Sequence, residues 1–287
     1  MFYKILLLIL IGIAQGILEW IPVSSEAFLF ILFLVYGASP TEAFLLSIIM
    51  HFPTALSAII YYKEDYKRIL KSFLNSTSLN ESKKILRFLI IGTIFTGLTA
   101  FPVFYTYKAF LQNIEENIYL GSMIALAGIG FAMMVMGIFL GKATKTYSFR
   151  EAHNITFSDS MLLGIAQGFS VLPGISRSGL TISVLLFRKF KQDEAVRLSF
   201  LIAPIIIIAG VIFEILLEKP YLGIMKVSII ELVILSITAF FSALISIKFM
   251  IKLARRLNFS QFLIVMGLFL AVYGIGAFLA ILPKPSR

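Results

Sequence analysis

Apolar runs of about twenty residues alternate with short polar segments along most of the chain. Since a helix needs about 20 residues to cross a bilayer, six runs predict membrane-spanning helices: 43–62, 88–106, 118–140, 194–217, 227–251 and 260–282. Two further apolar stretches, 2–37 and 160–187, are interrupted by the polar segments EWIPVSSE (19–26) and VLPGISRSG (171–179). Pro, Gly and Ser interrupt helices, and non-helical backbone is tolerated at membrane depth only inside protein or beside a cavity. We therefore expect each interrupted stretch to form a re-entrant helix hairpin.

The basic residues predict the orientation. Eighteen of the 25 lysines and arginines fall in segments 63–87, 142–150, 188–197 and 248–256, whereas six occupy the remaining loops and ends. With six crossings and two hairpins, all four basic segments lie on one side of the membrane. The positive-inside rule makes that side cytoplasmic. The chain is thus predicted to be a multi-pass plasma-membrane protein with both termini outside.

The sequence also contains an internal repeat. GIAQG at 12–16 recurs at 164–168, and EAxxLS at 42–47 recurs at 194–199, both with an offset of 152 residues; AxxGIG occurs at 125–130 and at 271–276. Each half then holds one hairpin and three crossings, and an odd number of crossings inverts the second half. The predicted fold is an all-α polytopic membrane protein with an inverted-topology repeat, in which the polar site lies near the midplane between the interrupted segments.

In this interpretation residues 1–287 form a single membrane domain. Repeat one covers 1–141 with its hairpin at 2–37, and repeat two covers 160–287 with its hairpin at 160–187. A cytoplasmic linker, 142–159, joins them. The first hairpin enters from outside and the second from inside, so their polar tips can meet.

Composition supports this class and excludes others. Hydrophobic residues make up 59% of the chain and charged residues 14%, whereas soluble domains carry about 25% charged residues. The absence of cysteine excludes disulfides, thiolate catalysis and cysteine-ligated metals. The net charge of +10 resides between apolar runs, so we assign it to topology and anionic headgroups, and we expect no nucleic-acid partner.

The first tip carries a candidate acid–base centre. A charge at the bilayer centre costs about 2.5–3.5 kcal/mol on insertion scales, so Glu19 is a functional candidate. Gln15 lies on the same helix face at spacing i, i+4. Glu19 can serve as a general base or bind a divalent cation. Ser25, next to Ser24, is a candidate nucleophile or a hydroxyl that positions phosphate or water.

The second tip carries the chemistry of an oxyanion cradle. Gly174 and the following helix start offer backbone N–H groups, and Arg177 offers a fork matched to phosphate oxygens. Hydroxyl donors complete the set: Ser176, Ser178 and Thr181. Two structural alternatives stay open, namely a Glu19–Arg177 strut between the halves and an ordinary capped turn.

Two further residues are candidates with a structural alternative each. Glu26 either belongs to the site or is solvated at the hairpin tip. His51, in the apolar context LSIIMHFPTALS, either has a function or is a satisfied core histidine.

With these residues the chain resembles the bacitracin-resistance type of undecaprenyl-diphosphate phosphatase. The family motif PGxSRSxxT is complete: Pro173, Gly174, Ser176, Arg177, Ser178 and Thr181. The other family motif, ExxxE followed by PVSSxxH, is present in part: Glu19, Pro22, Val23, Ser24 and Ser25. The resemblance extends over the whole chain, including the repeat and the hydropathy pattern.

The resemblance implies a membrane phosphatase that removes the terminal phosphate of a polyprenyl diphosphate, of undecaprenyl or dolichyl type. It would return the monophosphate carrier for glycan assembly. By resemblance, Arg177, Ser176 and Thr181 hold the diphosphate, while Ser25 and Glu19 act on it. A divalent cation, Mg²⁺ or Ca²⁺, is expected to bind with the substrate, with Glu19 as its protein contact.

Two departures from the family pattern matter. Gln15 replaces the first glutamate of ExxxE, which removes one negative charge and argues against a tightly held all-protein metal site. Phe28 occupies the position of the motif histidine and cannot shuttle a proton. Either Glu26 or Glu19 takes that role, or catalysis is weak; His51 substitutes only if the fold brings it close.

Two other functions stay as alternatives. One is a flippase for polyprenyl phosphate without hydrolysis, and the other is a non-catalytic lipid-binding subunit. The expected partners are the polyprenyl diphosphate and the bilayer. A homodimer is compatible with the sequence, which does not fix the oligomeric state.

Overall fold

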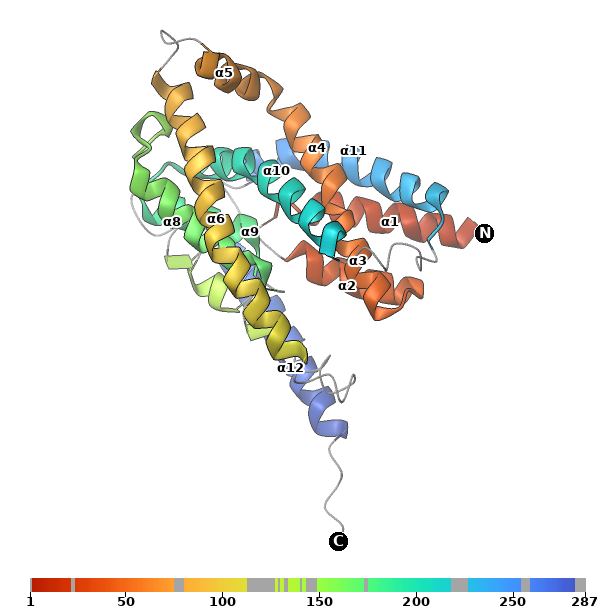
Figure 1. Ribbon diagram of the computed structural model, residues 1–287. Helices are drawn as coiled ribbons and strands as arrows, with labels where there is room; N and C mark the ends of the chain where they lie inside the picture. Colours follow the sequence, from red (N-terminus) through yellow and green to blue (C-terminus); the bar gives the residue numbers. More distant parts are fainter. Residues whose placement is uncertain are drawn as a thin grey trace.

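The computed structural model is built of helices and describes residues 2–21, 24–74, 80–112, 127–128, 130–131, 134–139, 141–142, 149–172, 175–217, 227–253 and 259–281. The first half contains α1 (Phe2–Leu18), α2 (Ser25–Tyr36), α3 (Pro40–Ile49), α4 (His51–Tyr61), α5 (Lys63–Leu74) and α6 (Asn80–Gln112). The second half contains η1 (Ala152–Asn154), α8 (Phe157–Gly168), η2 (Phe169–Val171), α9 (Arg177–Phe187), α10 (Gln192–Leu217), α11 (Ile229–Leu253) and α12 (Phe259–Ile281) (Figure 1).

Four of the described segments are long and apolar enough to cross a membrane: 42–61, 81–107, 192–216 and 229–252. They coincide with four of the six predicted spans, and α12 covers the predicted span 260–282. The predicted span 118–140 lies largely outside the described residues. The all-α membrane class is confirmed.

The first predicted span is two helices rather than one. α3 ends at Ile49 and α4 begins at His51, with Met50 between them. Pro53 in the first turn of α4 has no N–H and cannot donate to the carbonyl four residues earlier. The resulting break places His51 at the junction of the two helices.

The interrupted stretch 2–37 forms a helix–loop–helix pair whose two ends lie together. Lys4 Nζ pairs with Glu231 Oε1 at 2.8 Å, and the Tyr36 hydroxyl donates to the same carboxylate oxygen at 3.0 Å. Since Lys4 is near the start of α1 and Tyr36 ends α2, the stretch returns to the end of the molecule at which it began.

The stretch around 160–187 behaves in the same way. The backbone N–H of Arg150 donates to the carbonyl of Lys189 at 2.8 Å, and that of Lys191 donates to the Arg150 carbonyl at 2.9 Å. α8 begins at Phe157, three residues before the expected boundary, because Thr156 and Asp159 form a capping box. At about 1.5 Å per residue, α8 and α9, with 12 and 11 residues, are both shorter than the ~30 Å hydrocarbon core.

The repeated GIAQG segments are sites of close helix packing. α1 lies along α11, and α8 lies along α6 (Figure 1). A Cβ added at Gly16 would lie 1.9 Å from Ser242 Oγ of α11, and one at Gly164 would lie 2.5 Å from the Gly92 carbonyl of α6. Small residues at such interfaces let helix backbones approach closely. In both copies the first hairpin helix therefore packs on a long helix from the other half.

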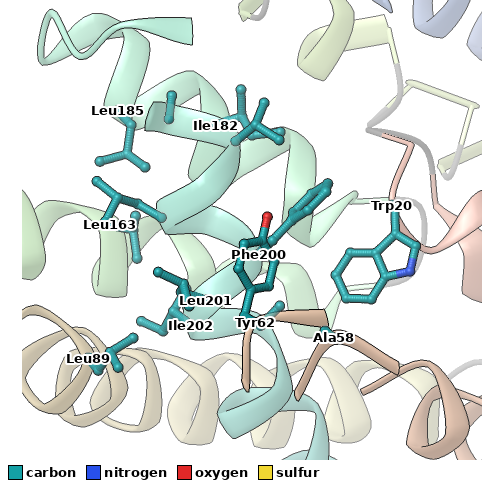
Figure 2. Close-up of a cluster of buried hydrophobic side chains, with 14 of the residues drawn as sticks. Trp20, Ala58, Tyr62, Leu89, Leu163, Ile182, Leu185, Phe200, Leu201 and Ile202 are labelled. Atoms are coloured by element: carbon teal, nitrogen blue, oxygen red, sulfur yellow. The ribbon is translucent and has the colours of Figure 1, made fainter. Parts of the chain in front are cut away.

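A large apolar core holds the tip of the first hairpin in place. Trp20, directly after Glu19, is fully buried, and its ring lies 4.8 Å from that of Phe200 in α10. Figure 2 shows Trp20 facing this cluster, which α4, α6, α8, α9 and α10 supply. Burying an aromatic side chain is worth several times the thermal energy, so the core fixes the backbone beside Glu19.

Candidate functional site

The polar tips of the two hairpins lie against each other. Arg177 Nη2 donates to Glu19 Oε1 at 2.8 Å, across 158 residues of sequence. Ser178 Oγ donates to the carbonyl of Ile21 at 3.1 Å. The Glu19 side chain is only 3% exposed. The sequence-based expectation that the tips can meet therefore agrees with the structure.

Two helix N-termini border the site. α2 begins at Ser25 and α9 at Arg177, which are 152 residues apart and thus equivalent positions of the repeat. Ser176 caps α9, since its hydroxyl accepts from the Gly179 N–H at 3.1 Å. Ser24 precedes α2 without a side-chain capping bond. Helix N-termini favour negative charge, because their first N–H groups and the helix dipole point at it.

The second oxygen of Glu19 accepts two hydrogen bonds and lies beside His51. Oε2 accepts from Gln15 Nε2 at 3.1 Å and from Ser25 Oγ at 3.1 Å, and His51 Nε2 lies 3.2 Å away. Gln15 also donates to the Met50 carbonyl at 3.3 Å. Gln15 is fully buried behind Glu19 and ties it to the junction of α3 and α4.

His51 faces Ser25 with a defined ring nitrogen. His51 Nε2 lies 3.3 Å from Ser25 Oγ, and Nδ1 lies 2.7 Å from the carbonyl oxygen of Ser47. A carbonyl only accepts hydrogen bonds, so Nδ1 carries the proton. In the neutral ring Nε2 is then an acceptor directed at the serine hydroxyl. The open question from the sequence is answered, because the fold brings His51 to the site.

A cavity of about 360 Å³ opens between the tips. This volume falls in the range of small-molecule sites. Eight of the sequence-derived candidates line it: Glu19, Ser24, Ser25, Glu26, His51, Ser176, Arg177 and Ser178. The rest of its wall is largely apolar and comes from α6 and α10.

Four polar lining residues were missed by sequence reasoning: Thr93, Thr96, Ser170 and Glu214. Glu214 is a buried carboxylate inside an apolar span, so the criterion that selected Glu19 would also have found it. The two threonines sit in an apolar run without any motif, and no sequence signal distinguishes them.

The remaining candidates have supporting positions or lie outside the described chain. Thr181 does not line the cavity; it donates to the Arg177 carbonyl at 3.0 Å and shares a 2.5 Å hydrogen bond with Ser199. Thr181 thus fixes the first turn of α9. Gly174 falls outside the described residues.

Arg177 keeps part of its fork available. Nη1 is buried and has no hydrogen-bond partner among the described residues, whereas Nη2 is used by Glu19. A buried, unpaired guanidinium N–H is costly. An anion in the cavity would satisfy it.

The described side chains around the cavity include few ligands for a metal ion. Within the described ranges, no group of three or more His, Asp or Glu residues is placed to hold a metal ion. Both oxygens of Glu19 are already engaged.

Comparison with known proteins adds a family assignment. The family model described as "Bacitracin resistance protein BacA" matches residues 8–273. A Methanococcoides burtonii protein named "Undecaprenyl-diphosphatase" is 35% identical over 269 residues, which cover 90% of this chain and 94% of the relative. Proteins of the same name from Methanothrix thermoacetophila and Saccharolobus solfataricus are 29% and 31% identical; the matches cover 91% and 94% of this chain and 93% and 96% of the relatives.

Proposed function

Because the chain belongs to the bacitracin resistance protein BacA family, we propose that it is a membrane phosphatase that hydrolyses undecaprenyl diphosphate to the monophosphate and inorganic phosphate. The assignment of this activity to the cavity between the hairpin tips rests on one observation. The Glu19–Arg177 pair brings both polar hairpin tips to one cavity, where a serine and a histidine face the same carboxylate.

The cavity suits a group with two phosphates. The N-termini of α2 and α9 border the cavity, and Ser24 and Ser178 line it beside them. Arg177 Nη1 supplies a charged donor between them. We assign one phosphate to each N-terminus, with Arg177 on the terminal phosphate, where preorganised donors stabilise the charge of the transition state.

Proton transfer falls to His51. The Ser25 hydroxyl donates to Glu19 Oε2 in the structure, and before attack it turns to His51 Nε2, 3.3 Å away. The imidazolium formed after proton uptake lies 3.2 Å from Glu19. A nucleophile, a base and an adjacent carboxylate form the arrangement that activates a hydroxyl for attack. His51 thereby takes the role that Phe28 cannot perform.

The attacking oxygen is either that of Ser25 or that of a water molecule hydrogen-bonded to Ser25. In both routes the new P–O bond forms at the terminal phosphorus, the anhydride P–O bond breaks, and the lipid monophosphate leaves. His51 accepts the proton of the attacking group. In the serine route, His51 passes this proton to the leaving lipid monophosphate and becomes neutral again. Water then attacks the phosphoserine with His51 as base, the P–O bond to Ser25 breaks, and inorganic phosphate leaves as the serine hydroxyl regains a proton.

A divalent cation, Mg²⁺ or Ca²⁺, enters this proposal as a companion of the diphosphate. The incomplete protein ligand set supports a cation held mainly by phosphate oxygens, with Glu19 as the protein contact. Such a cation would neutralise charge on the phosphates.

The membrane topology forms part of the proposal. We assign six crossings and two re-entrant hairpins in inverted halves, with both termini outside the plasma membrane. The joined ends of each hairpin and the short α8 and α9 helices support this assignment. So does the reciprocal packing of α1 on α11 and of α8 on α6.

The test is phosphate release from undecaprenyl diphosphate by the purified protein in detergent, with Mg²⁺, with Ca²⁺ and with chelator. We expect metal-dependent release that Arg177→Ala lowers by about 10²–10³-fold, the range found when one transition-state donor is removed. Arg68→Ala, at an exposed position of α5, is the matched control and should retain wild-type activity.

Two outcomes would contradict the proposal. Full activity of Arg177→Ala would place the site elsewhere. Absence of release from folded protein that binds the lipid would favour the flippase alternative, which no present observation supports, since the relatives are named as diphosphatases.

A further inference from the structure

α6 and α10 are in contact at two places along their length, with a gap between the two contacts. At the first level, a Cβ added at Gly92 would lie 2.6 Å from Ile202 Cδ1. At the second, the rings of Phe101 and Phe213 meet edge-to-face with centroids 5.1 Å apart. Between these levels lie Gly97 of α6 and Gly210 of α10, which both line the cavity. A Cβ added at either glycine meets no heavy atom within 4 Å.

Both glycines lie in the middle of a cavity-facing stripe. The lining residues of α6 recur at helical spacing: 93, 96, 97, 100, 101 and 104. On α10 the lining residues are 206, 207, 209, 210, 211, 213 and 214, with Gly210 at the centre. Residues three and four apart share a helix face, so the missing side chains of Gly97 and Gly210 would have pointed into the space between the helices.

The outer faces of the same helices are apolar and exposed. Leu98 is 65% exposed, Ile94 54% and Ile212 53%. In a membrane protein these side chains contact lipid. An opening between α6 and α10 would therefore lead from the phosphate site to the hydrocarbon region.

We propose that this opening is the window through which the polyprenyl tail leaves the headgroup site, with Gly97 and Gly210 as the residues that make room for it. The inference rests on the proposed function, because it assigns the tail of that substrate. The α6 stripe from 93 to 104 is roughly 16 Å long at 1.5 Å per residue. A polyprenyl chain is longer than that, and a cavity of about 360 Å³ cannot enclose it. Its first isoprenyl units would pack on the apolar wall, and the rest would lie in the bilayer.

The kinetic test replaces each glycine by leucine and compares two substrates. Undecaprenyl diphosphate needs the window, whereas dimethylallyl diphosphate, with one isoprenyl unit, fits inside the cavity. For Gly97→Leu and Gly210→Leu we expect kcat/KM on the long substrate to fall about tenfold or more, as overpacking of a fitted site predicts. The value for the short substrate should stay within about twofold of wild type. Gly276→Leu is the matched control, since Gly276 also has open space around it and lies outside the cavity lining.

Equal losses on both substrates would overturn the window, because they would mean damage to the phosphate site. Unchanged kinetics on both would overturn it as well. Failure of the wild type to hydrolyse either substrate would count against the phosphatase instead, and the binding experiment would then decide the window alone.

The binding experiment uses the absence of cysteine from the chain. Gly97→Cys, Gly210→Cys and Gly276→Cys each give a protein with one thiol, and mass spectrometry follows its reaction with methyl methanethiosulfonate. Undecaprenyl monophosphate should slow the reaction about tenfold at the first two positions and leave the third unchanged, because a bound tail covers only the window. Equal rates with and without the lipid at 97 and 210 would overturn the proposal.

Discussion

The proton acceptor of the proposed reaction comes from a different helix than the family motif indicates. Phe28 lies one turn after Ser25 in α2, where the motif has histidine, whereas His51 reaches Ser25 from the start of α4. The hydrogen bond from Nδ1 to the Ser47 carbonyl orients the ring. Such an orienting bond fixes the tautomer of a catalytic histidine.

Replacing His51 tests this role. His51→Gln keeps a polar side chain but cannot take up a proton, and His51→Ala removes the group altogether. We expect both to lower kcat by about 10²–10⁴, with KM within about threefold of wild type. Initial rates of phosphate release over a range of undecaprenyl diphosphate concentrations give kcat and KM separately.

A second substitution distinguishes a chemical role from a structural one. In the His51→Ala background, Phe28→His places an imidazole at the family position, three residues after Ser25 on the same helix face. We expect the double variant to have a kcat at least about tenfold above that of His51→Ala. Loss of folding in His51→Ala, or an unchanged kcat in either single variant, would contradict the assignment of His51 as the base.

Single residues also show what sequence could predict of the site. Glu19 and Arg177 could be predicted as site residues, because a charged side chain inside an apolar stretch is costly and usually has a function. The bond of Gln15 to Glu19 agrees with their i, i+4 spacing, whereas the bond of Gln15 to the Met50 carbonyl could not be predicted, since it depends on the junction between α3 and α4. His51 stayed open for the same reason, because only the fold fixes its distance to Ser25.

Among the helices, the glycines of GIAQG determine how closely α1 and α8 pack. A side chain at position 16 would meet Ser242 Oγ at 1.9 Å and the backbone of α11 at 2.5 Å. The repeat thus reflects a packing need in both halves, in addition to the common origin that the sequence indicates.

A valine side chain at position 16 should force α1 away from α11. Gly16→Val is expected to destabilise the protein by about 1–3 kcal/mol or more, and Gly168→Val, near Thr99 of α6, by a similar amount. Gly276→Val, in open space, is the control. Thermal unfolding in detergent gives the comparison; equal midpoints for Gly16→Val and Gly276→Val would contradict the close packing.

A buried ionic cluster anchors the beginning of α8. Asp159 accepts from Arg150 Nη2 at 2.6 Å, from Arg188 Nε at 2.6 Å and from the Thr156 N–H at 2.8 Å. Burial alone would raise the pKa of the Asp159 carboxyl, but the hydrogen bonds from Arg150, Arg188 and Thr156 outweigh it and hold this pKa below its ordinary value of 3.8.

The lowered pKa predicts an acid-sensitive anchor. The stabilisation is complete above the unfolded-state pKa of about 4 and is lost as the pH falls through the lower folded-state pKa. Asp159→Asn should cost about 3 kcal/mol at neutral pH, as for the loss of one partner from a buried pair. The difference in melting temperature between wild type and this variant should shrink between pH 5 and pH 2; a constant difference would contradict the role of the ionised carboxylate.

For the whole molecule, hydropathy predicted the spans better than it predicted their interruptions. The runs 88–106, 194–217 and 227–251 match α6, α10 and α11, since length and apolarity alone select a crossing helix. The break at Met50 was missed, because a proline in a helix-like run gives only a weak local signal. The window between α6 and α10 had no sequence signal, since two glycines in apolar helices look like ordinary packing residues.

The contacts at each end of the molecule predict which segments share a side of the membrane. Arg197 Nη2 pairs with Asp65 at 2.6 Å, and Lys84 Nζ donates to the His153 carbonyl at 2.6 Å. These contacts gather the starts of α6, α8 and α10 with α5. The Lys4–Glu231 pair gathers the starts of α1 and α11 elsewhere.

Thiol labelling in sealed, oriented vesicles tests the arrangement, again because the chain has no cysteine of its own. Lys71→Cys and His153→Cys should react with an impermeant maleimide from one side, and Tyr3→Cys and Ser228→Cys from the other. If one of the interrupted stretches crossed the membrane fully, its two ends would lie on opposite sides. Tyr3→Cys and Ser228→Cys would then be labelled from opposite sides. The hairpin topology therefore requires that both pairs stay together. Separation of Tyr3→Cys from Ser228→Cys would rule it out, because both interrupted stretches lie between these two residues.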